Sequence, residues 1–180
     1  MKYNPDIHHR RSIRLKGYDY SQAGYYFITI CCADRACLFG NIIDDSMYLN
    51  DFGIIAHDEW LKTVELRKNV LLDDFVIMPN HMHAIIILTE TDLSEEYNGS
   101  SISELGVCNT PLRSPSNNLG SIIRGYKSAV TKQIKQQNFH GQVWQRNYHE
   151  HIIRNEQSYQ KISQYIANNP TTWNEDCFYI

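Results

Sequence analysis

Residues 70–88 read VLLDDFVIMPNHMHAIIIL, two apolar runs on either side of Pro79-Asn80. Both runs are rich in aliphatic and β-branched residues, which pack well on a pleated surface and are typical of strands. Proline and asparagine supply the backbone geometry of a tight turn. The segment therefore predicts two strands, 70–78 and 81–88, that are joined by a short connection.

Upstream of this pair, residues 24–32 read GYYFITICC, an aromatic and β-branched run that predicts a central strand. Between the two regions, Asn50 can cap a helix over about residues 51–68. An apolar face of that helix is predicted from the spacing of Ile54, Ile55, Trp60, Leu61 and Val64.

Downstream, residues 90–118 are rich in Ser, Glu, Asn and Gly and hold few apolar residues, so we expect a mobile insertion loop. Asn118 can then cap a second helix, over about 119–137. Its apolar face would consist of Leu119, Ile122, Ile123, Tyr126, Val130 and Ile134. Four basic residues fall largely elsewhere, Arg124, Lys127, Lys132 and Lys135, so this helix presents positive charge to solvent or to a polyanion.

The last third of the chain predicts two more elements. Residues 143–146 read VWQR and predict a short strand. Asn155 and Glu156 begin a helix that ends before Pro170, because the residue before a proline avoids helical geometry. Without this last helix, the order of elements is the ferredoxin-like split β-α-β arrangement. We therefore expect an α+β fold, an antiparallel sheet with helices on one face, plus a C-terminal helix.

Composition limits the class of protein. A chain of 180 residues with 42% hydrophobic and 21% charged residues fits a single globular domain, 1–180. Its apolar runs are too short to span a bilayer and no signal peptide opens it, so we expect a cytoplasmic protein. Five cysteines without a Cys-x-x-Cys pair argue against a disulfide framework and a thiolate zinc site.

Charge is distributed unevenly along the chain. Residues 1–112 carry 9 Lys and Arg against 16 Asp and Glu, whereas residues 113–180 carry 8 against 4. A basic cluster, Arg10, Arg11, Arg14 and Lys16, precedes the first predicted strand. Basic surface on an acidic body can bind phosphates at a low overall pI. Ordinary solvated charge explains the same pattern, and charge alone favours that explanation.

His81-Met82-His83 is the most informative short motif. Positions i and i+2 of a strand share a face, so both imidazoles would project together while Met82 enters the core. Two neutral imidazoles form half of a site for a divalent ion. A chance pair of surface histidines is the alternative. His149-Glu150-His151 is a second such pair and ranks lower, because its central residue is charged.

Tyr165 lies on the last predicted helix, with Asn168 and Asn169 three and four residues later on a neighbouring surface. A phenol beside an amide and a metal could serve phosphoryl transfer. Ile162 and Ile166 flank Tyr165 at helical spacing, so core packing explains this position equally well.

Three motifs together resemble one known family, the single-tyrosine HUH transposases, and above all the REP-associated tyrosine transposases. They are MPNHMH at 78–83, VWQRNYHEHIIR at 143–154 and YIANNP at 165–170. The basic cluster and aromatic strand over 10–26 also resemble the start of that family, so the resemblance spans about residues 10–173.

The resemblance implies a metal-dependent single-stranded DNA endonuclease and strand transferase with a ferredoxin-like (RRM-like) catalytic domain. His81 and His83 match the two HUH histidines, which bind Mg²⁺ or Mn²⁺, and Asn169 matches the position of a third polar ligand. Tyr165 matches the catalytic tyrosine. The implied reaction passes through a 5′-phosphotyrosine and needs no other cofactor.

The implied substrate is single-stranded DNA folded as a REP-like or transposon-end hairpin. Phosphate contacts are expected from Arg10, Arg11, Arg14, Lys16, Arg124, Lys127, Arg146 and Arg154. Relatives work as dimers or as monomers, so a homodimer stays open. Two alternatives also stay open: a domesticated, catalytically silent DNA-binding protein with the same fold, and an unrelated metal-binding protein.

Overall fold

A computed structural model describes residue 15 and residues 17–90 and 118–179. Its central element is a four-stranded sheet in the order β4 (Val70–Ile77), β5 (His81–Leu88), β1 (Gly24–Cys31) and β6 (His149–Ile153), and every neighbouring pair is antiparallel. This is the order of the split β-α-β arrangement, so the predicted fold class is confirmed. The expected central strand does lie inside the sheet, between β5 and β6.

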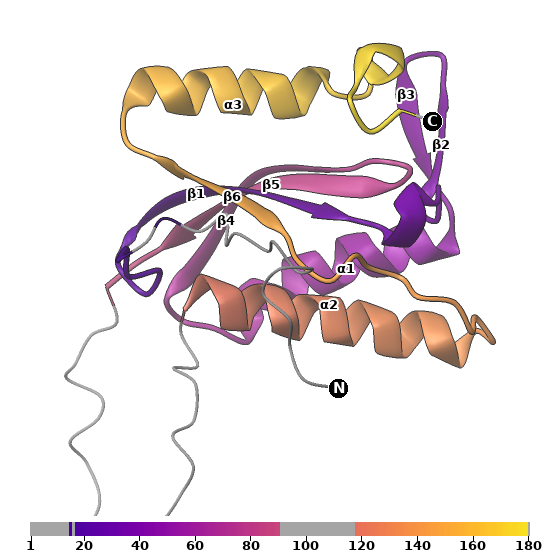
Figure 1. Cartoon of the computed structure of the whole chain (residues 1–180), viewed down its shortest axis with the longest axis horizontal. Coiled ribbons are helices and arrows are strands. Elements are labelled where there is room, and N and C mark those ends of the chain that lie inside the picture. The colour runs from indigo at the N-terminus through magenta and orange to yellow at the C-terminus, as the bar shows by residue number, and fades with distance from the viewer. Residues whose placement is uncertain (1–14, 16, 91–117, 180) are drawn as a thin grey trace, which may run out of the picture.

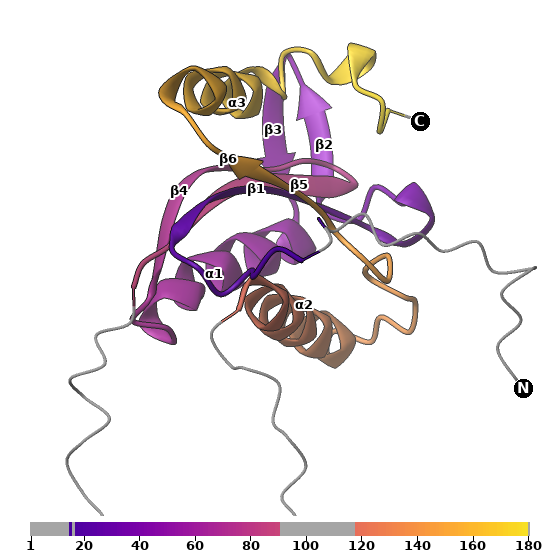
Figure 2. The same cartoon turned by 60° about the vertical axis from the view of Figure 1, so that its left-hand side comes forward.

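Helices cover both faces of the sheet. Two helices, α1 (Asp51–Glu65) and α2 (Leu119–Gln136), lie side by side under one face, whereas α3 (Glu156–Asn168) crosses the other face (Figures 1 and 2). The N-caps predicted from the sequence are all present: the side chains of Asn50, Asn118 and Asn155 accept hydrogen bonds from the backbone three residues later.

The main core lies between the sheet and α1 and α2. Alternate residues of β1 and β5 contribute to it, including Tyr26, Ile28, Met82 and Ile86, all fully buried. A smaller apolar cluster on the α3 face is formed by Ile85, Ile153 and Ile166, with Phe27, Val76, Tyr159 and Ile162 packed against it. The second face thus has less apolar packing than the first.

The predicted apolar face of α1 is partly wrong. Ile54, Leu61 and Val64 are exposed, and the residues that α1 buries are Gly53, Ala56, Trp60 and Thr63. Small residues let the helix approach its neighbours closely: a Cβ atom at Gly53 would lie 2.1 Å from the carbonyl oxygen of Phe39. The buried face of α1 therefore contains small residues, and three of its large apolar side chains are turned toward solvent.

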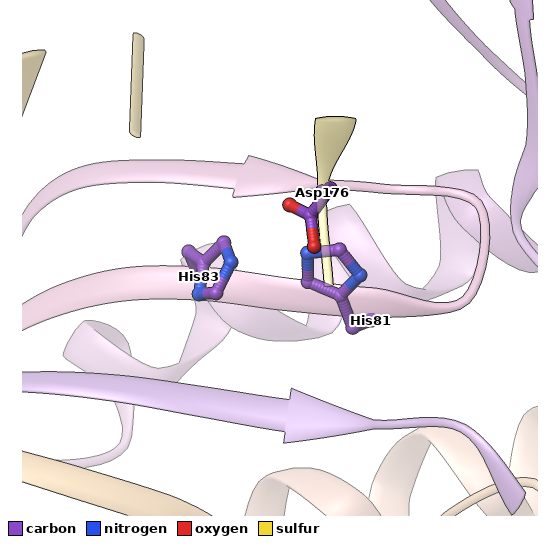
Figure 3. Close-up of side chains that lie close together, drawn as sticks. All are labelled: His81, His83 and Asp176. Atoms are coloured by element: carbon purple, nitrogen blue, oxygen red, sulfur yellow. The ribbon is translucent and has the colours of Figure 1, made fainter. Parts of the chain in front are cut away.

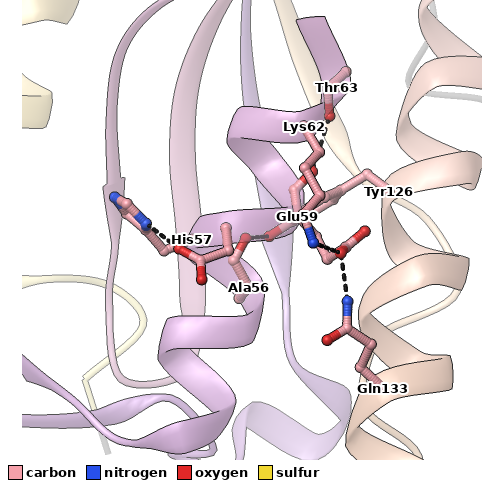
Figure 4. Close-up of polar contacts among 8 residues, drawn as sticks. Ala56, His57, Glu59, Lys62, Thr63, Tyr126 and Gln133 are labelled. Carbon is pink, nitrogen blue, oxygen red and sulfur yellow. Dashed lines mark hydrogen bonds and ion pairs between the residues drawn. The ribbon is translucent and has the colours of Figure 1, made fainter. Parts of the chain in front are cut away.

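Polar contacts also join α1 to α2 (Figure 4). The hydroxyl of the buried Tyr126 donates to the carbonyl oxygen of Ala56 at 3.0 Å. Gln133 donates from α2 to the Glu59 carboxylate, which also accepts from Lys62 of its own helix at 2.8 Å. These contacts set the register of the two helices beneath the sheet.

The prediction of a strand at 143–146 is wrong. In that segment only Trp144 forms a bridge, to Cys32, and the fourth strand of the sheet is β6, which holds the second histidine pair. Lys127 explains the difference, because its ammonium group donates to the carbonyl oxygens of Gln145 and Asn147. Those carbonyl groups are bound by a side chain from α2 rather than by a continuing ladder.

A hairpin that was not predicted, β2 (Gly40–Ile43) and β3 (Ser46–Leu49), forms its own two-stranded sheet. Asp44 and Asp45 form its two-residue turn with φ values of 48° and 59°, the left-handed geometry of a tight hairpin turn. The hairpin rises on the same side of the main sheet as α3 (Figure 2). Two one-turn helices, Ala33–Arg35 and Trp173–Glu175, complete the elements described.

Some predictions lie outside the described residues. They concern Arg10, Arg11, Arg14 and Lys16 of the basic cluster, and residues 91–117 of the expected insertion loop. Among the helices of the described residues, none is long and apolar enough to cross a membrane.

Candidate active site

Strand β5 places His81 and His83 on the sheet face that α3 covers. Their ring centroids lie 4.5 Å apart and both side chains are buried, with exposed fractions of 0% and 2%. Met82 between them is fully buried in the opposite core. The alternation of the strand therefore brings the two imidazoles together, and the pair is not on the open surface.

The Nδ1 atoms of both histidines have protein partners. His81 Nδ1 donates to Asn80 Oδ1 at 2.9 Å, and the Asn80 amide group is oriented by its donations to the carbonyl oxygens of Arg35 and Phe178. His83 Nδ1 lies 2.8 Å from Thr29 Oγ1, across the β1–β5 ladder. The Asn80 oxygen keeps the proton on His81 Nδ1 and leaves the lone pair of His81 Nε2 available, whereas the Thr29 hydroxyl can donate to His83 Nδ1 or accept from it.

Asp176, which sequence analysis missed, completes a candidate metal site. Its carboxylate and the imidazoles of His81 and His83 place one ligand atom each within 4.8 Å of one another. Figure 3 shows the Asp176 side chain beside the His81 ring, held there by the segment that follows the short helix Trp173–Glu175. No spacing rule links residue 176 to residues 81 and 83, and only the fold brings them together.

Asn169, the predicted third ligand, lies next to this site. Its side chain is 1% exposed and its Nδ2 atom donates to Asp176 Oδ2 at 3.0 Å. Two buried atoms, Asn169 Oδ1 and His81 Nε2, have no hydrogen-bond partner among the described residues. A buried polar atom without a partner is costly, and a bound cation would satisfy both. The residues present therefore fit a divalent ion with nitrogen and oxygen ligands.

Electrostatics keep both imidazoles in the ligand form. Burial lowers the pKa of His81 to about 4, against the opposing influence of the Asp176 carboxylate and the Asn169 amide. Burial, with a smaller contribution from His81, lowers the pKa of His83 to about 2. Both rings are therefore neutral at pH 7, the state that binds metals.

Tyr165 projects from α3 toward the histidine pair. Its hydroxyl lies 3.2 Å from His83 Nε2, and its ring packs edge-on against Phe27 at 6.2 Å. The side chain is 42% exposed, so one part faces the histidines and another faces solvent. Burial and then the Asp176 charge raise the pKa of the phenol, which is therefore protonated at pH 7. Core packing does not describe this position; Ile166 next to it is the buried residue.

Residues near the C-terminal end of the described chain pack over the rings. Phe178 lies 4.5 Å from His81 between ring centroids, and Trp173 lies 6.0 Å from it. Arg35 donates to the carbonyl oxygen of Cys177 at 3.1 Å. This packing supplies the desolvation that lowers the histidine pKa values.

The second histidine pair lies on the same face of the sheet. His149 is opposite Thr29 in the β1–β6 ladder, and Thr29 is opposite His83 in the β1–β5 ladder. His149 and His151 are exposed, unlike the buried pair on β5. They extend the polar row of the site toward the edge of the sheet and are not part of the candidate metal site that the described residues form.

The predicted phosphate contacts lie in two places. Arg124, Lys127 and Arg146 line a groove of about 740 Å³ between α2 and residues 140–146, where Lys132 and Lys135 add positive charge. Lys127 is half-buried and bound to backbone carbonyl groups, so its contribution is mainly structural. Arg154 is exposed after β6 and lines a separate pocket beside α3.

Comparison with known proteins adds two likenesses. The chain is 46% identical to an uncharacterized protein of Haemophilus influenzae over 188 aligned residues, which cover 99% of this chain and 98% of that protein. Its structure is similar to that of a REP-associated tyrosine transposase bound to a REP hairpin, with a TM-score of 0.59 and 21% identity over 89% of this chain and 74% of the other. No protein-family model matches the chain. The second likeness establishes a transposase-like fold.

Proposed function

The chain belongs to the same family as the Haemophilus influenzae protein and has a transposase-like fold, and we propose that it is a tyrosine transposase of the HUH type that cleaves and rejoins single-stranded DNA. One observation carries the proposal. The hydroxyl of the partly exposed Tyr165 lies 3.2 Å from His83 Nε2, beside the cluster of His81, His83 and Asp176. A nucleophile next to a candidate ion site is the arrangement that phosphoryl transfer requires.

The residues that would hold a divalent ion are His81 and His83 through Nε2 and Asp176 through its carboxylate, with Asn169 Oδ1 as a further oxygen donor. When bound, such an ion neutralises charge on the scissile phosphate and polarises its phosphorus–oxygen bonds. Two imidazole nitrogens with oxygen ligands suit Mn²⁺ better than Mg²⁺, which prefers an all-oxygen shell. We therefore assign the cofactor as Mn²⁺, with Mg²⁺ as the alternative.

Tyr165 supplies the nucleophile. Its phenol oxygen bonds to phosphorus as the bond to the 3′-oxygen of the preceding nucleotide breaks, and the phenol proton passes to water. The leaving oxygen takes up a proton and becomes a free 3′-hydroxyl, while the other strand stays attached to Tyr165 as a 5′-phosphotyrosine. A different 3′-hydroxyl can reverse the step, which rejoins strands without an external energy source.

The proposed substrate is a hairpin-bearing single strand. The structurally similar transposase is one bound to a REP hairpin. In this chain, the groove along α2 is lined by Arg124, Lys132, Lys135 and Arg146 and by no acidic residue of the described chain. Residues 143–147 lead from that groove into β6, whose His149 and His151 continue on the catalytic face. A bound strand could therefore pass around the β6 edge to Tyr165, with its phosphates on the basic groove.

The decisive experiment is covalent trapping. Purified protein is incubated with a 5′-labelled or 3′-labelled hairpin single strand and Mn²⁺ or Mg²⁺, and the adduct is resolved on a denaturing gel. Wild type should form an adduct that carries the 3′ part of the strand, and Tyr165→Phe should form none. Tyr48→Phe is the matched control, because Tyr48 is another exposed tyrosine, on the β2–β3 hairpin, and should leave the adduct unchanged.

An undiminished adduct in Tyr165→Phe would reject Tyr165 as the nucleophile. Hairpin binding by wild type without any adduct would favour the silent DNA-binding protein instead. Metal binding without any preference for single-stranded DNA would favour an unrelated metal-binding protein.

A further inference from the structure

A second pocket, of about 430 Å³, lies between the start of β1 and the start of α3. Five of its lining residues carry the inference: Tyr25, Asp73, Ile153, Arg154 and Tyr159. It is on the same face of the sheet as Tyr165, because α3 forms one of its walls. Its mixture of aromatic, apolar and hydrogen-bonding groups is that of a pocket for a small polar ring.

Tyr25 offers a stacking surface. Its side chain is 44% exposed, and its ring is held edge-on by Tyr159 at 6.0 Å between centroids. Aromatic rings held in this way are the usual platforms for unpaired bases, which stack on them regardless of sequence. Because the ring is already held by Tyr159, little further ordering is needed when a base arrives.

Asp73 supplies a directional acceptor in the same pocket. Asp73 Oδ2 accepts from the Tyr159 hydroxyl at 2.8 Å, and Oδ1 accepts from the backbone N–H of Asp74 at 2.9 Å. Hydrogen bonding to this carboxylate raises the pKa of Tyr159 to about 12, so the phenol stays a donor at pH 7. Each carboxylate oxygen can accept two hydrogen bonds, so one acceptor position is left on each.

The two oxygens of one carboxylate match a base that has two adjacent donors. Guanine is the base whose Watson–Crick edge has two adjacent N–H donors, whereas cytosine and adenine each present one amino group there. Arg154, exposed at the rim, is the side chain that pairs with the guanine O6 and N7 acceptors. The two acidic groups near the pocket, Asp73 and Glu156, disfavour a phosphate inside it.

We propose that this pocket binds a guanine base, stacked on Tyr25, with its N–H edge on the Asp73 carboxylate and its O6 and N7 edge toward Arg154. The inference rests on the proposed function, since it takes the guanine to belong to the bound single strand. Tyr159 and Tyr165 are six residues apart on α3, which is about 9 Å at 1.5 Å per residue. That distance corresponds to two or three stacked nucleotides at about 3.4 Å each. The guanine should therefore lie within about three nucleotides of the cleaved phosphate.

The test uses binding rather than cleavage. In full-length Tyr165→Phe protein, hairpin strands are compared in which guanines near the cleavage position are replaced, one at a time, by inosine, which lacks the N2 amino group. At one position we expect inosine to weaken binding by roughly 5- to 150-fold, the range for a bidentate base contact. In Tyr165→Phe/Asp73→Asn, guanine and inosine at that position should bind equally.

Asp74→Asn is the matched control, because Asp74 is the adjacent carboxylate, accepts from Ser163 and does not line the pocket. It should retain the guanine preference. If Asp73→Asn does not fold, Tyr25→Ala replaces it and should weaken binding of every base at that position. Inosine tolerated at every position, or a guanine preference that survives in Asp73→Asn, overturns the proposal.

A second experiment tests whether the pocket binds a guanine within a strand or also binds a free guanine nucleotide. Saturation-transfer NMR with GMP should show transfer to the guanine protons in wild type and none in Asp73→Asn. Transfer absent in wild type, together with an inosine effect on the hairpin, places the base within a strand only. A guanine preference without any Tyr165 adduct would support the guanine pocket and reject the catalytic proposal. An adduct without any guanine preference would support the catalytic proposal and reject the guanine pocket.

Discussion

The two faces of the four-stranded sheet differ in what fills them. The face under α1 and α2 is packed with fully buried apolar side chains such as Ile28, Met82 and Ile86. The face under α3 has a small apolar cluster at one end and buried polar groups, Thr29, His81 and His83, at the other. Successive residues of strand β5 contribute side chains to the two faces in turn. Apolar packing and the proposed chemistry therefore lie on opposite faces of a single strand, and this separation can be tested position by position.

The largest expected effect comes from the polar face. His83→Gln keeps the side-chain volume close and retains an amide for Thr29, but removes the nitrogen beside Tyr165. Adduct formation should fall by more than the roughly 10- to 100-fold that loss of an outer hydrogen-bond partner costs a metal site. Labelled-hairpin trapping measures this directly.

Met82→Ala is the counterpart on the apolar face. A fully buried methionine replaced by alanine should lower the free energy of unfolding by about 2–5 kcal/mol. Chemical denaturation measures the loss, and the protein that remains folded should still form the adduct. The separation of the two faces would be refuted if folded Met82→Ala protein formed no adduct. It would also be refuted if His83→Gln lowered the free energy of unfolding more than Met82→Ala does.

Acid should lower the stability of the folded protein through the two buried histidines of the polar face. The pKa values of His81 and His83 in the folded, metal-free protein, about 4 and about 2, lie below their ordinary value of 6.5. Below pH 6.5 the unfolded chain takes up protons that the folded chain does not, so stability is fully present above that pH and falls toward pH 4. Each histidine contributes a slope of up to about 1.4 kcal/mol per pH unit there.

Denaturation of metal-free protein at pH 7, 6 and 5 measures that slope. The double variant His81→Gln/His83→Gln should show a shallower dependence on pH than wild type. An equal slope in both proteins would mean that other groups cause the acid sensitivity.

The smallest expected effect is on metal affinity, from a residue that contacts a proposed ligand and not the ion itself. Asn80→Ala removes the acceptor of His81 Nδ1–H and so releases the ring tautomer. Affinity for Mn²⁺, measured by calorimetry on folded protein, should fall by roughly 10- to 100-fold. Asn41→Ala on the β2–β3 hairpin is the matched control, and equal affinities in the two variants would remove Asn80 from the ligand-positioning role.

The parts of this fold that follow strong local rules could be predicted from the sequence. The alternation of β5 places two imidazoles on one face whatever covers it, and an asparagine before an apolar helical pattern caps the helix by a local hydrogen bond. The strand at 149–153 and the β2–β3 hairpin were missed because short strands are decided by their partners. Residues 143–146 look more strand-like, yet Lys127 from α2 binds the carbonyl oxygens of Gln145 and Asn147.

The candidate site was predictable only in part, for the same reason. His81, His83 and Tyr165 belong to motifs that can be read from the chain, whereas Asp176 approaches the histidines through a turn after a one-turn helix. Likewise, Asn80 and Thr29 orient the imidazoles through contacts that depend on the turn after β4 and on the register of β1 with β5. Tertiary contacts of this kind leave no periodic trace in the amino-acid sequence.

The contact between Asn80 and Phe178 joins parts of the chain that are synthesised at different times. The Asn80 amide is fixed by the carbonyl oxygen of Phe178, 98 residues later, and both Tyr165 and Asp176 lie beyond residue 155. Domains emerge from the ribosome N-terminal part first. A nascent chain that has already built the β4–β5 hairpin therefore holds the histidines but neither the phenol nor the carboxylate. Under the proposed function, the ability to cut DNA would arise abruptly, once residues 165–178 have been synthesised, rather than accumulate as the protein grows.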